Sequence, residues 1–134
     1  MVLACIYALI RGRWPERVGG VCFTIAWLGS EVIEDFRYVQ NRMHPMQMQA
    51  AIAALDVAWA GVLLILVFST RRRWAPIAFG FQCLILALHL CTYLDIRISR
   101  FDFFSAYFVA SWSELAVFAL GSAIEGRRPV WSSV

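Results

Sequence analysis

Long apolar stretches dominate the chain and are separated by short polar connections. Four of them approach or exceed the roughly 20 residues that an α-helix needs to cross about 30 Å of hydrocarbon. They cover residues 18–36, 48–68, 74–94 and 103–124. A fifth stretch, residues 2–10, is long enough for only about half a bilayer. The pattern predicts an all-α integral membrane helical bundle, with four full transmembrane helices plus a short N-terminal helix, as a single transmembrane domain over residues 1–134.

Proline and arginine mark the connections between these stretches. Pro15 follows Arg13-Trp14 and fits the first turn of a helix, where its missing N–H costs nothing. Residues 41–47 include a proline, residues 71–73 are three consecutive arginines, and residues 97–100 separate the last two predicted helices. Because each connection is short, consecutive helices are expected to run in opposite directions.

Composition and charge agree with a membrane protein and give it an orientation. Hydrophobic residues make up 61% of the chain, and the mean hydropathy of +0.67 exceeds that of an ordinary soluble domain. One side of the predicted bundle carries most of the arginines: Arg11, Arg13, Arg17, Arg71, Arg72, Arg73, Arg127 and Arg128. The positive-inside rule places this side, and with it the C-terminus, in the cytoplasm. A net charge of +3 with so few residues outside the membrane argues against a nucleic-acid partner.

A weak internal repeat relates the two halves of the chain. Laying residues 11–63 over 71–123 without a gap aligns Arg13-Trp14 with Arg73-Trp74, and further matches follow in the same register. A tandem repeat of a helical hairpin would give both copies the same direction in the membrane. Shared sorting signals in the connections, with Arg-Trp on one side, explain the same matches without duplication.

Each of the four long apolar stretches has an acid or a histidine well away from both of its ends. These residues are Glu31, Asp56, His89 and Glu114. An acid or base at mid-helix costs roughly 2.5 to 3.5 kcal/mol on insertion, so such groups usually face one another or water. Gln82 lies seven residues before His89, on the same helical face. The sequence therefore predicts a polar bundle core formed by these five side chains.

Such a core has three possible roles. Carboxylates and histidine relay protons in membrane proteins, so the first is a site for protons, a cation or a small ligand. The second is ligation of a metal or haem, with nitrogen from His89 and oxygen from Glu31 or Glu114. The third is structural: a hydrogen-bonded network that fixes helix packing, with Glu114 protonated or paired to His89. The sequence does not identify the substrate or cofactor.

A cluster of sulfur and imidazole ligands lies between the second and third predicted helices. It consists of Met43, His44, Met46 and Met48. Thioether and imidazole groups favour Cu(I), which makes this segment a candidate metal site. Met46 and Met48 fall where a helix is predicted to begin, and flexible apolar packing is the favoured explanation for them.

A second functional hypothesis is a non-catalytic accessory subunit or scaffold. The chain has no GxSxG nucleophile elbow, no phosphate-binding glycine loop and no HExxH zinc motif, which favours a protein without enzymatic activity. Beyond the lipid bilayer, the expected partner is then a larger membrane complex or further copies of this chain. The last helix has an aromatic end suited to docking, formed by Phe101, Phe103, Phe104, Tyr107 and Phe108. Contact with lipid explains these residues equally well.

Several short strings resemble a group of short bacterial multi-span inner-membrane proteins to which no activity is assigned. The similarity covers residues 10–121. It is carried by Arg13-Trp14-Pro15-Glu16-Arg17, Asp56, Arg73-Trp74, Phe81-Gln82, His89 and Trp112-Ser113. The resemblance implies the same multi-span architecture and a place in the bacterial inner membrane. Many members have an uncharged residue near Glu114 and a longer first helix, and the second difference suggests a start upstream of Met1.

Overall fold

The computed structural model describes residues 2–40, 45–94, 96 and 99–125 and contains five α-helices in this part of the chain. They are α1 (Val2–Arg11), α2 (Trp14–Gln40), α3 (Pro45–Ser69), α4 (Trp74–Tyr93) and α5 (Arg100–Glu125). The prediction of an all-α bundle is therefore confirmed. The arginine-rich segment at 71–73 separates α3 from α4, as the sequence pattern indicates.

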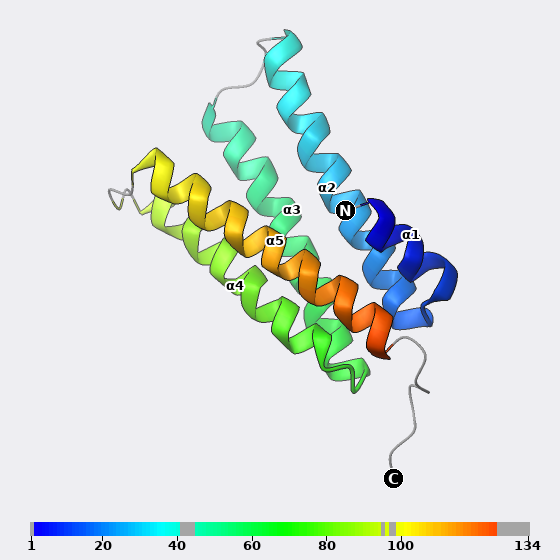
Figure 1. The fold of residues 1–134 in the computed structure, drawn as a ribbon. Helices are drawn as coiled ribbons and strands as arrows, with labels where there is room; N and C mark the ends of the chain where they lie inside the picture. The colour runs from blue at the N-terminus through cyan, green and yellow to red at the C-terminus, as the bar shows by residue number, and fades with distance from the viewer. Residues whose placement is uncertain (1, 41–44, 95, 97–98, 126–134) are drawn as a thin grey trace.

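Consecutive helices pack side by side and run in opposite directions (Figure 1). The short helix α1 contacts both α2 and α5, so the first helix of the chain lies against the last. The connections from α1 to α2 and from α3 to α4 lie at the same end of the bundle (Figure 1). We call this the basic end, because it holds Arg11, Arg13, Arg17 and residues 71–73. The other is called the opposite end.

Local chemistry fixes the start of α2 at the basic end. Pro15 is in the first turn, and the Glu16 carboxylate accepts the backbone N–H of Arg13 at 3.0 Å, which caps the helix. Gly12 precedes this turn, and a Cβ there would overlap the carbonyl oxygen of Ala8. Only glycine therefore fits this close return of the chain from α1 to α2.

An apolar core fills the half of the bundle nearer the basic end. Its buried members are Ala8, Trp59, Leu63, Leu66, Trp74, Ala75, Ala78 and Phe118. The Phe118 ring of α5 meets Trp74 of α4 edge-on, at 5.2 Å between centroids, and stacks on Phe23 of α2 at 6.2 Å. These aromatic contacts join three helices, so this half of the bundle has an apolar, closely packed interior.

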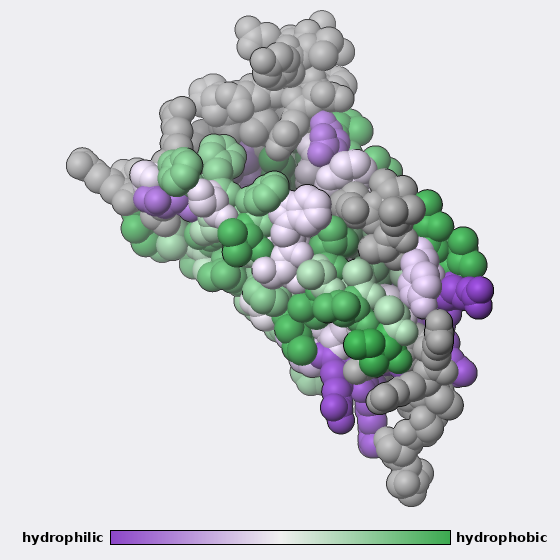
Figure 2. Space-filling view, in the orientation of Figure 1, coloured by the Kyte–Doolittle hydropathy of each residue, from purple (hydrophilic) through white to green (hydrophobic). Residues whose placement is uncertain are grey.

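The outer surface of the bundle is apolar. Within the described residues, three segments are long and apolar enough to cross a membrane, namely Gln49–Ser69, Trp74–Tyr93 and Phe101–Ile124. At most 28% of the most apolar part of any of them is buried inside the protein. Figure 2 shows green hydrophobic surface along the bundle and purple hydrophilic side chains at both of its ends. Apolar exposure on this scale suggests insertion into a membrane.

The prediction of four full transmembrane helices is supported for three helices only. At 27 residues α2 is long enough to cross a bilayer, but charge interrupts its apolar composition. It carries Glu16 and Arg17 near its start, Glu31 further along, and Glu34 and Asp35 close to its end. Every window of 18 residues within α2 therefore contains more than two charged residues. By contrast, α3, α4 and α5 each contain an apolar window of 18 residues with at most two charged residues.

We predict that Gly121→Ala destabilises the bundle. A Cβ at Gly121 would overlap the Cβ of Trp74, a rigid part of that side chain, so α4 and α5 would have to move apart. Overpacking of this kind costs about 1 to 3 kcal/mol. The free energy of unfolding, measured by titrating detergent-solubilised protein with dodecyl sulfate, should fall by that amount.

Gly61→Ala is the matched control for this prediction, because nothing lies within 4 Å of the position of its added Cβ. Its stability should stay the same or rise by up to about 1 kcal/mol, the difference in helix propensity. Equal stability of the two variants would contradict the close packing of α5 on Trp74.

Candidate functional site: a polar cluster between α3, α4 and α5

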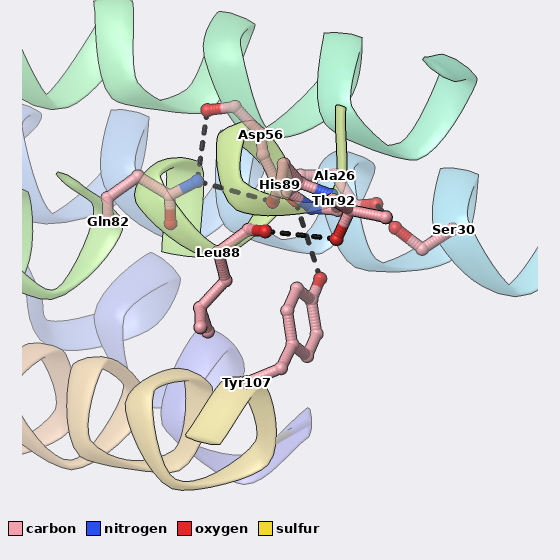
Figure 3. A network of polar contacts seen from close by, with 8 residues as sticks. All are labelled: Ala26, Ser30, Asp56, Gln82, Leu88, His89, Thr92 and Tyr107. Atoms are coloured by element: carbon pink, nitrogen blue, oxygen red, sulfur yellow. Dashed lines mark hydrogen bonds and ion pairs between the residues drawn. The ribbon is translucent and has the colours of Figure 1, made fainter. Parts of the chain in front are cut away.

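The Asp56 carboxylate of α3 is the centre of a polar cluster (Figure 3). Its Oδ1 accepts a hydrogen bond from Gln82 Nε2 at 3.2 Å, and the same nitrogen donates to the Asp56 backbone carbonyl at 3.0 Å. Its Oδ2 lies 2.9 Å from His89 Nε2 and accepts the Tyr107 hydroxyl at 3.4 Å. One acidic side chain thus joins α3 to both α4 and α5.

The spacing of polar residues on α4 explains why two of its side chains reach the same carboxylate. Gln82 and His89 are seven residues apart, or two helical turns, so they project from one face. That face is the buried side of α4, where Gln82 is 1% and His89 5% exposed. Its other buried residues are Trp74, Ala75, Ala78 and Ile85. The buried face therefore changes from apolar at the basic end to polar further along.

Aromatic rings of α5 form an apolar wall beside His89. The imidazole lies edge-on to Phe103 and Tyr107, at centroid distances of 6.0 and 5.8 Å. The rings of Phe103 and Tyr107 stack on each other at 6.1 Å. Because these rings restrict the imidazole, it is held in the orientation that points Nε2 at Asp56.

A second buried carboxylate lies one layer nearer the basic end. Glu114 of α5 is 2% exposed, and its Oε1 accepts the indole N–H of Trp59 at 2.5 Å. Trp59 follows Asp56 by three residues, so both lie on the same face of α3. The Asp56 and Glu114 carboxylates are close enough to interact electrostatically. One expectation from the sequence is a pair between Glu114 and His89. In the structure His89 contacts Asp56 instead, and Glu114 contacts Trp59.

The hydrogen bonds of the cluster leave one buried nitrogen available. When His89 Nε2 carries the hydrogen and donates it to Asp56, the carboxylate is satisfied by donors from three side chains. His89 Nδ1 then has a lone pair, and it has no hydrogen-bond partner among the described residues. Ser30 and Thr92, also drawn in Figure 3, bond to carbonyls of their own helices and do not reach it.

The cluster lies in the half of the bundle away from the basic end. Asp56 is about 20 Å from the last residue of α3 at 1.5 Å per residue, and the apolar core around Leu63, Leu66 and Phe118 fills that distance. From Asp56 to Gln49, where the apolar part of α3 begins, is only about 10 Å. The side chain of Asp56 is 14% exposed, so the cluster is not completely enclosed.

The structure brings together most of the predicted polar set. Asp56, Gln82 and His89 are in direct contact, and Glu114 is buried beside them. Glu31 is exposed on α2, and none of the contacts described for the cluster includes it. Haem or metal ligation by His89 with Glu31 therefore has no support in the geometry.

The candidate copper ligands fall where the structure gives no side-chain information. Met43 and His44 lie outside the described residues. Met46 and Met48 are in the first turn of α3, but their side chains are also outside the described part. Within the described part of the chain, no three His, Cys, Asp or Glu side chains are grouped to hold a metal ion.

Sequence reasoning missed Trp59 as a partner of the site and Glu16 as a buried acid. Trp59 is one more apolar residue in a long apolar run, and only its spacing of three from Asp56 could have indicated that it shares the polar face. Glu16 is 0% exposed although it lies in a charged connection. Its position, three residues after Arg13 at a helix start, is the signal of a capping acid.

No protein-family model matches the chain, and neither the curated proteins nor the solved structures contain a match. The function must therefore be inferred from the geometry of the site.

We predict that Asp56→Asn destabilises the protein by at least about 2 kcal/mol. The substitution keeps the size of the side chain, but it removes the charge and places an NH₂ group among the donors of Gln82, His89 and Tyr107. Buried donors left without an acceptor cost about 1 to 3 kcal/mol each. Unfolding of detergent-solubilised protein by dodecyl sulfate, followed by tryptophan fluorescence, measures the loss.

Glu31→Gln is the control for this variant. It removes the charge of another acid inside a predicted span, but from an exposed position. Its free energy of unfolding should stay within about 0.5 kcal/mol of the unsubstituted protein. Similar losses in both variants would show that the Asp56 contacts add nothing beyond the charge itself.

Proposed function

We propose that this is a small multi-pass membrane protein whose Asp56–His89 pair binds and releases a proton within the bilayer. The observation that carries the proposal is the 2.9 Å contact between a buried imidazole and a carboxylate that also accepts bonds from Gln82 and Tyr107. The carboxylate orients the ring and balances the charge of an imidazolium. The free lone pair of His89 Nδ1 is where the proton would bind.

Charge balance supports a proton rather than a larger ligand. Asp56 as carboxylate and His89 as imidazolium have no net charge, whereas the pair with a neutral imidazole has a charge of −1. A net charge is costly in apolar surroundings, so proton binding at His89 changes the electrostatic energy of the whole bundle. The other titratable groups around the imidazole are Tyr107, which shares Asp56 Oδ2, and Glu114, which interacts with Asp56.

We further propose the membrane placement of this site. α2 would be the fourth span, since it is long enough and packs along α3. The basic end, with the C-terminus, would face the cytoplasm of a bacterium across the inner membrane. The Asp56–His89 pair would then lie in the half of the bilayer away from the cytoplasm. A tandem origin of residues 11–63 and 71–123 is compatible with the equal direction of α2 and α4.

A row of exposed aromatic residues favours a second candidate, docking of the protein as an accessory subunit on a larger membrane complex. Phe101, Phe104, Phe108 and Trp112 follow each other at helical spacing along α5, and each is more than half exposed. Aromatic residues are enriched where helices meet protein partners. In this second role the Asp56–His89 pair would only fix the packing of α3, α4 and α5.

Histidine-selective ¹⁵N NMR separates the two candidates. The chain has two histidines, His44 and His89, and a His89→Gln variant assigns the signals. Between pH 5 and 9 we expect His89 to change reversibly between its neutral and charged forms while the circular dichroism and the elution volume stay constant. Asp56→Asn should alter the titration curve, because the imidazolium loses its counter-charge, whereas Glu31→Gln should leave it unchanged.

A single protonation state of His89 throughout this range would contradict proton binding. So would a change of state that occurs only as the protein unfolds. Either result would leave the packing role of the pair, and with it the accessory candidate.

A further inference from the structure

A buried ion pair ties together the two connections at the basic end. Glu16 of α2 is 0% exposed, and its Oε1 lies 3.0 Å from Nε of Arg72, which is 6% exposed and lies between α3 and α4. The same oxygen accepts the indole N–H of Trp74 at 3.5 Å. Since Oε2 accepts the backbone N–H of Arg13, one carboxylate fixes both connections relative to each other.

The ion pair has a consequence for the surface around it. Five arginines at this end are exposed, namely Arg11, Arg13, Arg17, Arg71 and Arg73. Arg17 is held in place by a bond from its Nε to the carbonyl oxygen of Gly12 at 3.0 Å. Residues 11–17 and 71–74 together contain six arginines and one acid, Glu16, which is buried and neutralised by Arg72. The exposed surface that these two segments form is therefore rich in positive charge.

The positive surface lies at the depth of lipid headgroups. The apolar segment of α3 ends at Ser69 and that of α4 begins at Trp74, so Arg71 and Arg73 are at the edge of the hydrocarbon. Trp14 lies beside Arg13 and is 45% exposed, and tryptophan is enriched at this interface. Guanidinium groups bind phosphate with two parallel hydrogen bonds. The phosphate of a lipid headgroup is therefore a suitable ligand for these exposed arginines.

We propose that the basic end binds the phosphate groups of anionic phospholipids, between Arg13 and Arg17 on one side and Arg71 and Arg73 on the other. These two pairs of arginines come from separate connections, and the Glu16–Arg72 ion pair sets their relative position. The site does not depend on the Asp56–His89 pair, which lies on the other side of the apolar core.

Binding of a fluorescent short-chain phosphatidylglycerol to detergent-solubilised protein tests the proposal. Phosphatidylcholine is the neutral reference, and the fluorescence anisotropy gives both affinities. We expect tighter binding of phosphatidylglycerol, with a loss of about fivefold for each arginine removed and about 25-fold for Arg71→Gln/Arg73→Gln. Arg100→Gln, a variant at the start of α5 and hence at the opposite end, should bind as the unsubstituted protein does.

Glu16→Gln separates a built site from simple charge attraction. This variant adds one positive charge to the basic end but breaks the pair that positions the two connections. A site that depends on this geometry predicts weaker binding, whereas attraction by total charge predicts equal or tighter binding. An unfolding titration of the same sample checks that the variant is folded, and Arg71→Gln/Arg73→Gln supplies an independent test if it is not.

Three results would overturn the proposal. The first is equal affinity for phosphatidylglycerol and phosphatidylcholine, and the second is unchanged affinity in Arg71→Gln/Arg73→Gln. The third is displacement of the lipid by an equal concentration of inorganic phosphate, which would identify a soluble anion as the ligand. Failure here would leave the His89 titration unaffected, because the two experiments probe different ends of the bundle.

Discussion

The contact between Asp56 and the donors of α4 and α5 is the interaction on which the polar half of this bundle depends. An acid in the middle of an apolar helix has no favourable position in hydrocarbon, so α3 can be accommodated only if other helices supply partners. Gln82, His89 and Tyr107 do so from two neighbouring helices. The cost of burying one charge therefore fixes the relative rotation of three helices. Van der Waals packing between apolar helix surfaces alone would define this rotation less well.

The two halves of the bundle are organised by different forces. Near the basic end, Trp74, Phe118 and the aliphatic residues of α3 form an apolar core, where glycine at position 121 permits close approach of α5 to α4. Further along, polar side chains replace these residues on the same helix faces. In the proposed role, a proton bound at His89 would face this apolar core toward the basic end, which favours exchange toward the opposite end.

Much of this arrangement could be predicted from the sequence, because helical periodicity is a local property. The spacing of seven between Gln82 and His89 places them on one face, and the insertion cost of Asp56 implies that it points inward. The exposure of Glu31 could not be predicted, since it depends on how α2 is rotated. Gly20 packs near Ala8 of α1, and Gly29 packs against Leu55 of α3. These tertiary contacts turn Glu31 outward.

Contacts between distant segments could not be predicted either, because they depend on tertiary packing and not on local periodicity. Trp59 and Glu114 are 55 residues apart, and nothing local indicates that an indole N–H meets that carboxylate. Glu16, in the first turn of α2, and Arg72, between α3 and α4, each lie in an arginine-rich stretch that is typical of an exposed surface, yet the ion pair between them is buried. Only the packing of the two connections against each other removes these two side chains from water.

A double-mutant cycle between Asp56 and His89 tests the central interaction most directly. The free energy of unfolding is measured for the unsubstituted protein, Asp56→Asn, His89→Gln and the double variant. We predict that the two losses are not additive, with a coupling energy of at least about 1 kcal/mol, because the second substitution removes a partner that is already lost. Losses that add to within about 0.3 kcal/mol would contradict the contact between these side chains.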